Sequence, residues 1–565
     1  MQRALVIAIF AACAARARPF TLRDPLVIDT DMRPVFVPCR HDPDTKGPTR
    51  VTCAPREYIS PFIWDALDNM LFGRLSRALE LNVTGEARNV NSLDEVPDSS
   101  WFTNRRTLDD RSVDAPGSCT QADLLPGPDD VAPRTWVIDR GKDNGASHGF
   151  RVDVPGMGKY MLKTDDDGEP ERATAASVIS AAIYNAIGFN TPCEQVVVLK
   201  QQQLALTPNL KHIDNAGIVT PFDQAALANM LAKATQLPGG AVRMHASKWL
   251  PGLVIGPFRY IGTRADDPND VIDHGERREL RGSRILAAWL NHWDTRSQNT
   301  MDVWLAANEN DKRSSPGYVV HYILDTSDTL GGVLPDDKAS RRLGHAYLFD
   351  AGELARAVVL LGADERPWDR AHRQPGKDKF NYFSARDFDP ARWRPVYPNP
   401  AFDRMTERDA AWMARKIARF SPADIRRFVE LGKWSNPDDA AYVAKVLVER
   451  QRRILTRYLT GLSPLGDVHT EGPTRICATD FARLRDIAPS FRYTAQRNGD
   501  ALPIVTGPEG RVCVDVAAAP HGSIADADPR RRIQIAIRNG TRARPLIIHA
   551  YELETGLKIV GVTRE

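Results

Sequence analysis

The chain has 565 residues, which at roughly 150 residues per domain allows about three or four domains. Its apolar fraction of 42% and charged fraction of 26% are ordinary for a globular protein, which excludes a mainly disordered, collagen-like or coiled-coil chain. The formal net charge is +3, from 75 basic and 72 acidic residues, so bulk electrostatics give no reason to expect nucleic acid as a partner.

The first twenty residues resemble a targeting segment. Arg3 precedes an uncharged run over residues 4–12, which is long enough for the core of a signal peptide and too short to span a bilayer. The letters Phe-Ala-Ala-Cys that end at Cys13 are similar to the lipobox of bacterial lipoproteins, in which the cysteine carries lipid. We therefore expect a signal peptide over 1–20 and a protein of the bacterial cell envelope, periplasmic or at the surface, that is attached to the membrane by its lipid only. A secreted protein and a cytoplasmic protein are the alternatives.

Six cysteines remain beyond Cys13, and an even number suits an oxidising compartment. The pairs that follow from position in the chain, the last of them by elimination, are Cys39 with Cys53, Cys477 with Cys513, and Cys119 with Cys193. Closing the shortest of these loops would contribute about 3 kcal/mol. Six reduced, buried cysteines are the alternative. The sequence holds no Cys-x-x-Cys, so a structural zinc site is not expected.

Residues 21–134 are rich in Pro, Asp and Arg. They show one helical pattern, over 63–81, where apolar side chains recur at helical spacing. A loop over 116–133 follows, with the composition of a linker. We interpret 21–134 as an irregular N-terminal extension.

Short strand patterns begin at residue 135. Three of them, at 135–139, 150–154 and 159–163, predict an antiparallel meander. A helix over 170–187 follows, with Pro at its start and Gly188 at its end. Further candidates are strands at 194–199, 204–207 and 242–249 and a short helix at 222–234. From these six strand candidates we expect a five-stranded sheet with one helix inserted after the third strand.

After Gly252 the pattern becomes mainly helical. A helix is predicted over 276–291, and a strand pair at 301–305 and 318–324 surrounds a polar insertion. Three helices are predicted between residues 406 and 462. From residue 472 to the end, strand patterns return and predict a small β domain.

The most specific segment runs from His292 through Asp294 to Asn299, and a later strand ends at Asp325. Phosphoryl transfer needs a carboxylate near the acceptor hydroxyl and oxygen ligands that hold magnesium on the β- and γ-phosphates. Asp294 and Asn299 share one loop, and Asp325 can supply a second carboxylate to the metal.

The order His-x-Asp-x4-Asn, followed by a strand pair that ends in Asp, resembles the catalytic and metal-binding segments of the protein-kinase-like superfamily. It is most similar to the divergent HipA-like and lipid-kinase-like branches, and the whole chain also resembles a group of bacterial envelope lipoproteins. The resemblance implies an α+β fold with a two-lobed kinase-like core. It covers roughly residues 135–465 and implies an antiparallel five-stranded N-lobe at 135–252 and a mainly helical C-lobe at 253–465. The irregular extension at 21–134 and a small β domain at 472–565 lie outside it.

The resemblance also implies roles for individual residues. Asp294 would take the proton of the acceptor hydroxyl or orient that hydroxyl, and Asn299 and Asp325 would hold Mg²⁺. Lys163, the other catalytic candidate, would contact the α- and β-phosphates of ATP. The glycines that would let the loop approach the phosphates closely are Gly141, Gly145 and Gly149.

The implied function is a phosphotransferase that uses Mg-ATP on an unknown acceptor. The alternative is a catalytically silent kinase-like lipoprotein that acts as an envelope binding or scaffolding module, because the bacterial envelope holds little ATP. A hydrolase built on His292 and Asp294 is a third reading, but no Gly-x-Ser-x-Gly nucleophile motif supports it. The expected partners are a nucleotide, an acceptor or envelope protein, and the membrane through the lipid anchor.

Overall fold

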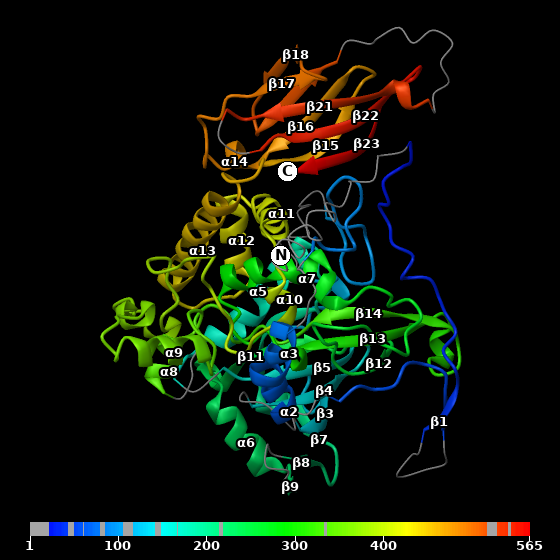
Figure 1. Ribbon diagram of the computed structural model, residues 1–565. Helices are drawn as coiled ribbons and strands as arrows, with labels where there is room; N and C mark the ends of the chain where they lie inside the picture. Colours follow the sequence, from blue (N-terminus) through cyan, green and yellow to red (C-terminus); the bar gives the residue numbers. More distant parts are fainter. Residues whose placement is uncertain are drawn as a thin grey trace, which may run out of the picture.

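The computed structural model has a mixed α+β fold with several sheets (Figure 1). It describes residues 22–42, 50–59, 62–79, 85–105, 117–141, 148–165, 168–213, 219–332, 336–516, 528–540 and 544–564. Cys13 and Gly145, both predicted site residues, lie outside these ranges. Within them, no helix combines the length and the apolar character needed to cross a bilayer.

A seven-stranded sheet lies in the part that was predicted to be a sheet with one inserted helix. Its strands are β3 (Trp136–Gly141), β4 (Gly149–Val154), β5 (Gly158–Lys163), β6 (Glu194–Lys200), β7 (Leu204–Leu206), β10 (Thr235–Leu237) and β11 (Ala241–Lys248). The order is β10-β11-β5-β4-β3-β7, and β6 also pairs with β11. The antiparallel meander β3–β4–β5 is confirmed.

The predicted strand number of five is wrong. At one edge of the sheet the short strand β7, predicted at 204–207, pairs with β3 in parallel. β10 pairs with one end of β11, on the side where β5 pairs with the other end, and β6 pairs along the opposite side of β11. β10 was not predicted, because its three residues are too few to show an alternating pattern in the sequence.

Helix α5 (Arg172–Ile187) follows β5, as predicted, and every one of its residues is buried. It begins two residues later than the predicted Pro170 and ends before Gly188, where a φ of 138° requires glycine. A Cβ at Gly188 would lie 2.5 Å from the ring of Phe102, so the residue also lets the N-terminal extension pack against the helix end. The small residues of α5 allow other elements to cover it on all sides.

The middle of the chain is mainly helical. The helix α7 (Arg278–Leu290) and the three helices predicted between 406 and 462 are confirmed, the latter as α11 (Glu407–Ile417), α12 (Pro422–Glu430) and α13 (Pro437–Tyr458). The side chains of Thr406, Ser421 and Asn436 cap these three helices by accepting backbone N–H groups of the first turn. The segment between α7 and α11 also holds α8 (Asp337–Arg341), α9 (Ala351–Val359) and α10 (Pro400–Asp403).

The predicted strand pair is also present and forms a hairpin. It consists of β13 (Thr300–Ala306) and β14 (Gly317–Ile323), and β12 (Leu253–Val254) pairs with β13. Thr300 faces Ile323 in the register, so the residues just outside the hairpin, Asn299 and Leu324, also lie side by side. The N–H of Leu324 donates to the carbonyl of Asn299 at 2.9 Å.

The N-terminal extension is irregular apart from short elements. It contains β1 (Arg40–Asp42), β2 (Arg50–Thr52), α2 (Phe62–Leu67) and α3 (Gly73–Leu79). One π-helical stretch, Asp68–Phe72, joins α2 and α3, so the helical pattern predicted over 63–81 is present. Elsewhere α6 (Gln224–Lys233) and the strands β8 (Lys211–Ile213) and β9 (Val219–Pro221) extend from the seven-stranded sheet (Figure 1).

The C-terminal part consists of two antiparallel sheets. The first has the order β15-β16-β20-β19 and contains β15 (Leu465–Glu471), β16 (Arg475–Asp480), β19 (Ile504–Thr506) and β20 (Arg511–Asp515). The second has the order β18-β17-β21-β22-β23 and contains β17 (Thr494–Arg497), β18 (Asp500–Leu502), β21 (Arg532–Arg538), β22 (Leu546–Leu553) and β23 (Gly556–Arg564). Their inner faces join the helices in one continuous apolar core that includes Trp289, Phe420 and Ile548.

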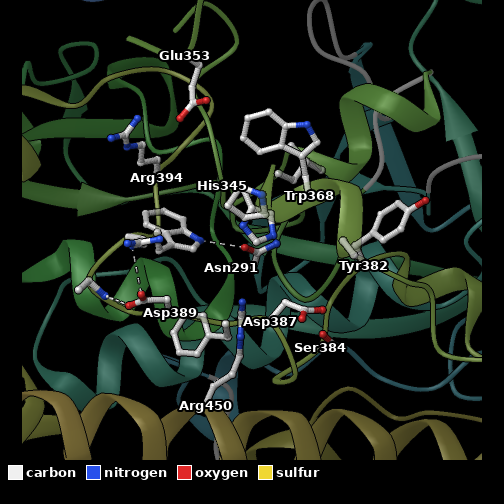
Figure 2. Close-up of a pocket in the computed structure, with 18 of the residues that line it drawn as sticks. Asn291, His345, Glu353, Trp368, Tyr382, Ser384, Asp387, Asp389, Arg394 and Arg450 are labelled. Atoms are coloured by element: carbon white, nitrogen blue, oxygen red, sulfur yellow. Dashed lines mark hydrogen bonds and ion pairs between the residues drawn. The ribbon is translucent and has the colours of Figure 1, made fainter. Parts of the chain in front are cut away.

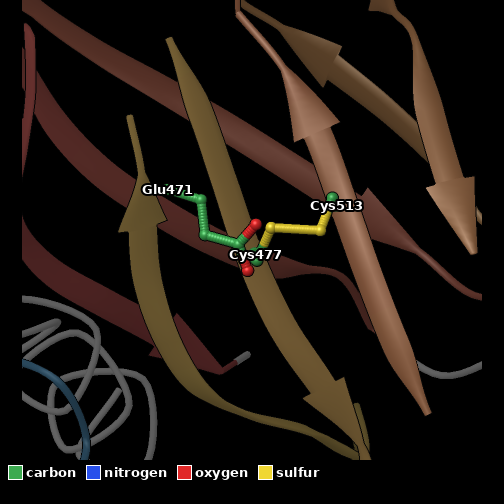
Figure 3. A group of neighbouring side chains, drawn as sticks. All are labelled: Glu471, Cys477 and Cys513. Atoms are coloured by element: carbon green, nitrogen blue, oxygen red, sulfur yellow. A yellow bond between two sulfur atoms is a disulfide. The ribbon is translucent and has the colours of Figure 1, made fainter. Parts of the chain in front are cut away.

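The three predicted disulfides are present: Cys39–Cys53, Cys119–Cys193 and Cys477–Cys513. Cys477 and Cys513 lie directly opposite each other on β16 and β20, with Glu471 beside them (Figure 3). Because the two sulfurs are bonded to each other, these residues are not available as thiolate ligands for a metal. Three disulfides fit a location outside the cytoplasm.

A buried carboxylate joins three parts of the chain. Asp94 of the N-terminal extension accepts hydrogen bonds at 2.6 Å from Arg278 of α7 and from Arg564 of β23, and Arg415 of α11 lies 3.7 Å away. Burial alone would raise the pKa of Asp94, but Arg278, Arg564 and Arg415 outweigh burial and lower it to about 2. The charge of Asp94 therefore holds the extension, the helices and the last strand together.

We expect Asp94→Asn to destabilise the protein by about 3–5 kcal/mol, because it leaves buried guanidinium groups without their carboxylate. Asn suits the positive φ of 60° at this position, so the effect reports the lost charge. The measurement is urea-induced unfolding. Asp467→Asn is the matched control, because Asp467 also has a positive φ and pairs with Arg419 at the surface. Its cost should stay below about 1 kcal/mol, and equal costs for the two variants would contradict the role of Asp94.

Candidate functional site

The centre of the candidate site is an ion pair between the seven-stranded sheet and the β13–β14 hairpin. Nζ of Lys163, at the end of β5, lies 2.9 Å from Oδ2 of Asp325, which follows β14. The other carboxylate oxygen of Asp325 accepts a hydrogen bond from Oγ of Ser327 at 2.6 Å. The side chain of Lys163 is 14% exposed and that of Asp325 is 32% exposed, so the pair is partly shielded from water and still accessible. These two predicted residues are thus brought together.

The loop that follows α7 carries the other two predicted residues. Asn291 ends α7 in a left-handed conformation, and this turn directs His292, Trp293 and Asp294 away from the helix. Nδ2 of Asn299 donates to the carbonyl of Asp294 at 2.7 Å, so the amide holds this loop closed. Asn299 also lies beside Leu324, one residue before Asp325. The backbone therefore places Asp294, Asn299 and Asp325 in one region.

Asp328 connects the loop to the turn after β14. Its Oδ2 accepts a hydrogen bond at 3.0 Å from the backbone N–H of Asp294. Arg172, at the start of α5, donates to the carbonyls of Ser327 at 2.6 Å and Thr329 at 3.2 Å and fixes this turn. The sequence predicted Asp325 as a metal ligand and the residues after it, up to 328, as a plain turn. It did not identify Asp328. The repeat of Asp three residues after Asp325 was the available signal.

The buried carboxylates of the site have unusual acidities. Burial and the nearby carboxylate of Asp328 raise the pKa of Asp294 to about 7, although Arg296 lies 3.0 Å from it. Burial, followed by the charge of Asp325, raises the pKa of Asp328 to about 7. One oxygen of each carboxylate, Oδ1, is buried and has no hydrogen-bond partner among the described residues. Such groups are energetically costly unless a positive charge neutralises them.

His292 is a structural residue in this arrangement. It is 2% exposed, and its Nδ1 lies 2.9 Å from the hydroxyl of Tyr184 on α5. Burial lowers its pKa to about 4, so the ring is neutral at pH 7. Its Nε2 lies 3.7 Å from Asp328. These contacts support the interpretation of His292 as a hydrogen-bonding residue of the core.

Two of the three glycines predicted to line a phosphate loop are described. Gly149 begins β4 and faces Lys163 in the strand register. A Cβ at Gly149 would lie 2.3 Å from the carbonyl oxygen of Leu162, so only glycine fits between the two strands. Gly141 ends β3, and a Cβ there would meet the side chain of His212 at 3.3 Å. Gly149 thus allows β4 to pack closely against β5 next to Lys163. Gly141 is farther from Lys163 in the sequence and packs near His212.

The donor set fits a divalent cation and the phosphates that it accompanies. Carboxylate and amide oxygens are the ligands that Mg²⁺ and Mn²⁺ prefer, and Asp325 and Asn299 supply them from adjoining segments. The buried, unpartnered oxygens of Asp294 and Asp328 are the groups that a cation would neutralise. Lys163 adds a compact positive charge beside Asp325.

Comparisons with known proteins show little. No family model matches the chain, and no curated protein matches it either. Among solved structures, the crystal structure of a Golgi casein kinase with Mn/ADP bound is 11% identical, with a TM-score of 0.26, over 59% of this chain and 72% of that chain. A second structure of a Golgi casein kinase is also 11% identical, with a TM-score of 0.22, over 72% of this chain and 93% of that chain. Superpositions at these scores do not establish a shared fold, so we interpret the site from its own residues.

The raised pKa of Asp328 predicts a pH-dependent effect of Asp328→Asn. The folded carboxyl group binds its proton more tightly than the unfolded one, so its contribution to stability falls as the pH rises from about 4 to about 7. At pH 8 wild type buries a charge that Asn lacks, whereas at pH 5 both side chains are neutral. We expect the variant to unfold at least about 2 °C above wild type at pH 8 and at the same temperature at pH 5.

The measurement is thermal unfolding at both pH values in the presence of EDTA, which keeps divalent cations from the site. Asp129→Asn is the matched control, since Asp129 is 86% exposed and should show no such difference. A shift for Asp328→Asn that is the same at pH 5 and pH 8 would contradict the raised pKa of Asp328.

Proposed function

We propose that the protein is a kinase-like phosphotransferase that uses Mg-ATP, with residues 135–252 and 253–465 acting as its two lobes. The observation that carries the proposal is the Lys163–Asp325 ion pair beside the loop that bears Asp294 and Asn299. A charged lysine, a carboxylate and an amide from three separate segments form a set that phosphate and a divalent cation can use together.

Each residue has a distinct role in this proposal. Lys163 binds phosphate oxygens of the nucleotide through its ammonium group. These phosphates would compete with Asp325 for the positive charge of Lys163. Asp325 and Asn299 hold the cation, and Asp328 supports them by fixing the backbone of Asp294. The cation, when bound, neutralises charge on the phosphates. Asp294 orients the acceptor hydroxyl and takes its proton at the carboxylate.

The electrostatics of Asp294 suit that role. A general base works best when its pKa lies near the operating pH, and burial raises the pKa of Asp294 to about 7. Arg296, 3.0 Å from Asp294, limits this rise and keeps a fraction of the carboxyl groups ionised at neutral pH. Asp294→Asn retains the shape of the side chain and loses the proton acceptor.

The test is nucleotide binding, measured by calorimetry with ATP and ADP in the presence of Mg²⁺ or Mn²⁺. We expect binding to weaken at least about tenfold in Lys163→Met, because a charge-assisted contact to phosphate is lost. Lys159→Met is the matched control: Lys159 lies on the same strand and face, pairs with Asp139, and should leave binding unchanged. A folded sample that binds no nucleotide with either metal would refute the phosphotransferase proposal.

Turnover distinguishes the proposal from the silent scaffolding alternative. Phosphate released from ATP, or transferred to the protein itself, should fall to background in Asp294→Asn while nucleotide binding persists. Binding without turnover in wild type would favour the scaffolding alternative. The observation that favours that alternative is the direct contact between Lys163 and Asp325, since each satisfies the charge of the other without a ligand.

We also propose that Cys13 is lipidated and anchors the protein in the bacterial envelope. Three disulfides in the folded part support an oxidising compartment, and Phe-Ala-Ala-Cys at 10–13 is the pattern on which lipidation depends. Cells fed a labelled fatty acid should label wild type and leave Cys13→Ser unlabelled. Labelling that persists in Cys13→Ser would overturn the assignment, and a released, unlabelled wild-type protein would indicate secretion.

A further inference from the structure

One cavity of the structure lies apart from the Lys163–Asp325 pair. It has a volume of about 440 Å³ and lies between α7, α13 and the segment that connects α7 to α11 (Figure 2). Small-molecule sites fall in this range of volumes. None of Lys163, Asp294, Asn299 or Asp325 lines it. Of the residues that line the cavity, Asn291 is the closest in sequence to the candidate site, three residues before Asp294.

Arg450 of α13 points into this cavity and carries a charge that the protein does not balance. The residue is 5% exposed, and its Nε is buried without a hydrogen-bond partner. Its only hydrogen bond in the described chain goes from a terminal nitrogen to the carbonyl of Trp289 at 3.2 Å. No described carboxylate lies within ion-pair distance of it. A fully buried arginine is uncommon unless an anion pairs with it.

The immediate surroundings of Arg450 are aromatic. Its guanidinium lies 4.0 Å from the ring centre of Phe388 and 4.8 Å from that of Phe383. Burial lowers the pKa of Arg450 to about 9, and the charge of Arg453 adds to this effect. The group is still protonated at pH 7. Burial, followed by the charge of Arg450, also lowers the pKa of His345 in the same cavity, so that this ring is neutral.

Most of the other charged groups in the cavity wall have a charged partner. Arg356, Arg392 and Arg394 form ion pairs, and Glu353 pairs with Arg366. Arg284 donates to the carbonyls of Ala391 at 2.9 Å and Trp393 at 3.0 Å. Asp387 is the remaining carboxylate, and it lies beyond ion-pair distance of Arg450. Figure 2 shows the guanidinium of Arg450 reaching upward into the cavity, toward Asn291.

We propose that this cavity binds a small ligand whose oxyanion, such as a phosphate group, pairs with Arg450. Arginine suits oxyanions because its planar fork can donate two parallel hydrogen bonds. The indole ring of Trp368 lines the cavity and offers an apolar surface for the body of the ligand. The ligand class is therefore a phosphate monoester with an apolar or aromatic body. This site is independent of the proposed nucleotide site.

The experiment measures the binding of inorganic phosphate and of phenyl phosphate by calorimetry. The full chain carries Lys163→Met, so that binding at the proposed nucleotide site does not contribute. We expect phenyl phosphate to bind and Arg450→Met to weaken it at least about tenfold. Arg457 lies on the same helix as Arg450 and forms a surface ion pair with Glu407. Arg457→Met removes this pair and should leave binding unchanged. Trp368→Ala should weaken phenyl phosphate and leave inorganic phosphate unchanged.

Stability of the free protein gives a second readout that separates loss of the site from misfolding. Met fills much of the volume of Arg450 without a buried charge, so Arg450→Met should unfold at the same temperature as the parent or higher. Phenyl phosphate should raise the unfolding temperature of the parent and not that of Arg450→Met. Absence of binding at millimolar ligand, or binding that persists in Arg450→Met, would overturn the proposal. A destabilised Arg450→Met would likewise contradict an unbalanced charge at this position.

Discussion

The neutralisation of one buried carboxylate, that of Asp94, is the constraint on which the architecture depends. Its partners come from α7, from α11 and from β23, whose Arg564 is 470 residues away in the sequence. Because the core of the helices continues into the C-terminal sheets, apolar contact alone could hold several arrangements of these parts. A buried charge with directed partners permits far fewer, because any arrangement that separates them leaves charges unpaired.

At the candidate site, buried carboxylates lack the partners that Asp94 has. Asp94 is satisfied within the protein, whereas Asp294 and Asp328 each bury an oxygen that has no partner in the described chain. Arg450 is the counterpart of opposite sign, a buried cation without a described carboxylate. Buried charged groups without a partner are typical of sites where a ligand supplies the missing charge. The contrast between balanced and unbalanced burial thus supports the proposed cation site and the proposed anion site.

The sequence predicted the elements whose apolar pattern repeats over many residues. Helix α5, the three helices after residue 406 and the β13–β14 hairpin have long periodic patterns, and their positions are confirmed within a few residues. Strand β7 was predicted at 204–207, whereas β10 was not, because three residues carry no period. Two of the disulfides were predicted because their cysteines lie in the same part of the chain, and the third followed by elimination.

Parts of the site were less accessible to sequence reasoning. Lys163 and Asp325 were predicted from the order of motifs, and their contact of 2.9 Å agrees with that order. Asp328 and Arg172 were missed because their roles come from hydrogen bonds to backbone groups far away in the sequence. Arg450 gives no signal at all in the sequence, since an arginine in a helix is ordinarily exposed. Only the packing of α13 shows that it is buried.

The register of the β4–β5 hairpin has a consequence for how such a chain can vary. Gly149 faces Lys163 across these strands, and Val154 faces Gly158 at the turn. Successive side chains of a strand point to opposite faces, so one residue added or lost between Val154 and Lys163 would turn the lysine away from Asp325. The length of this turn therefore cannot change, and its two glycines, Gly156 and Gly158, have positive φ values of 76° and 85° that favour glycine. Among related chains, the spacing between these two strands should therefore be more constant than their residues.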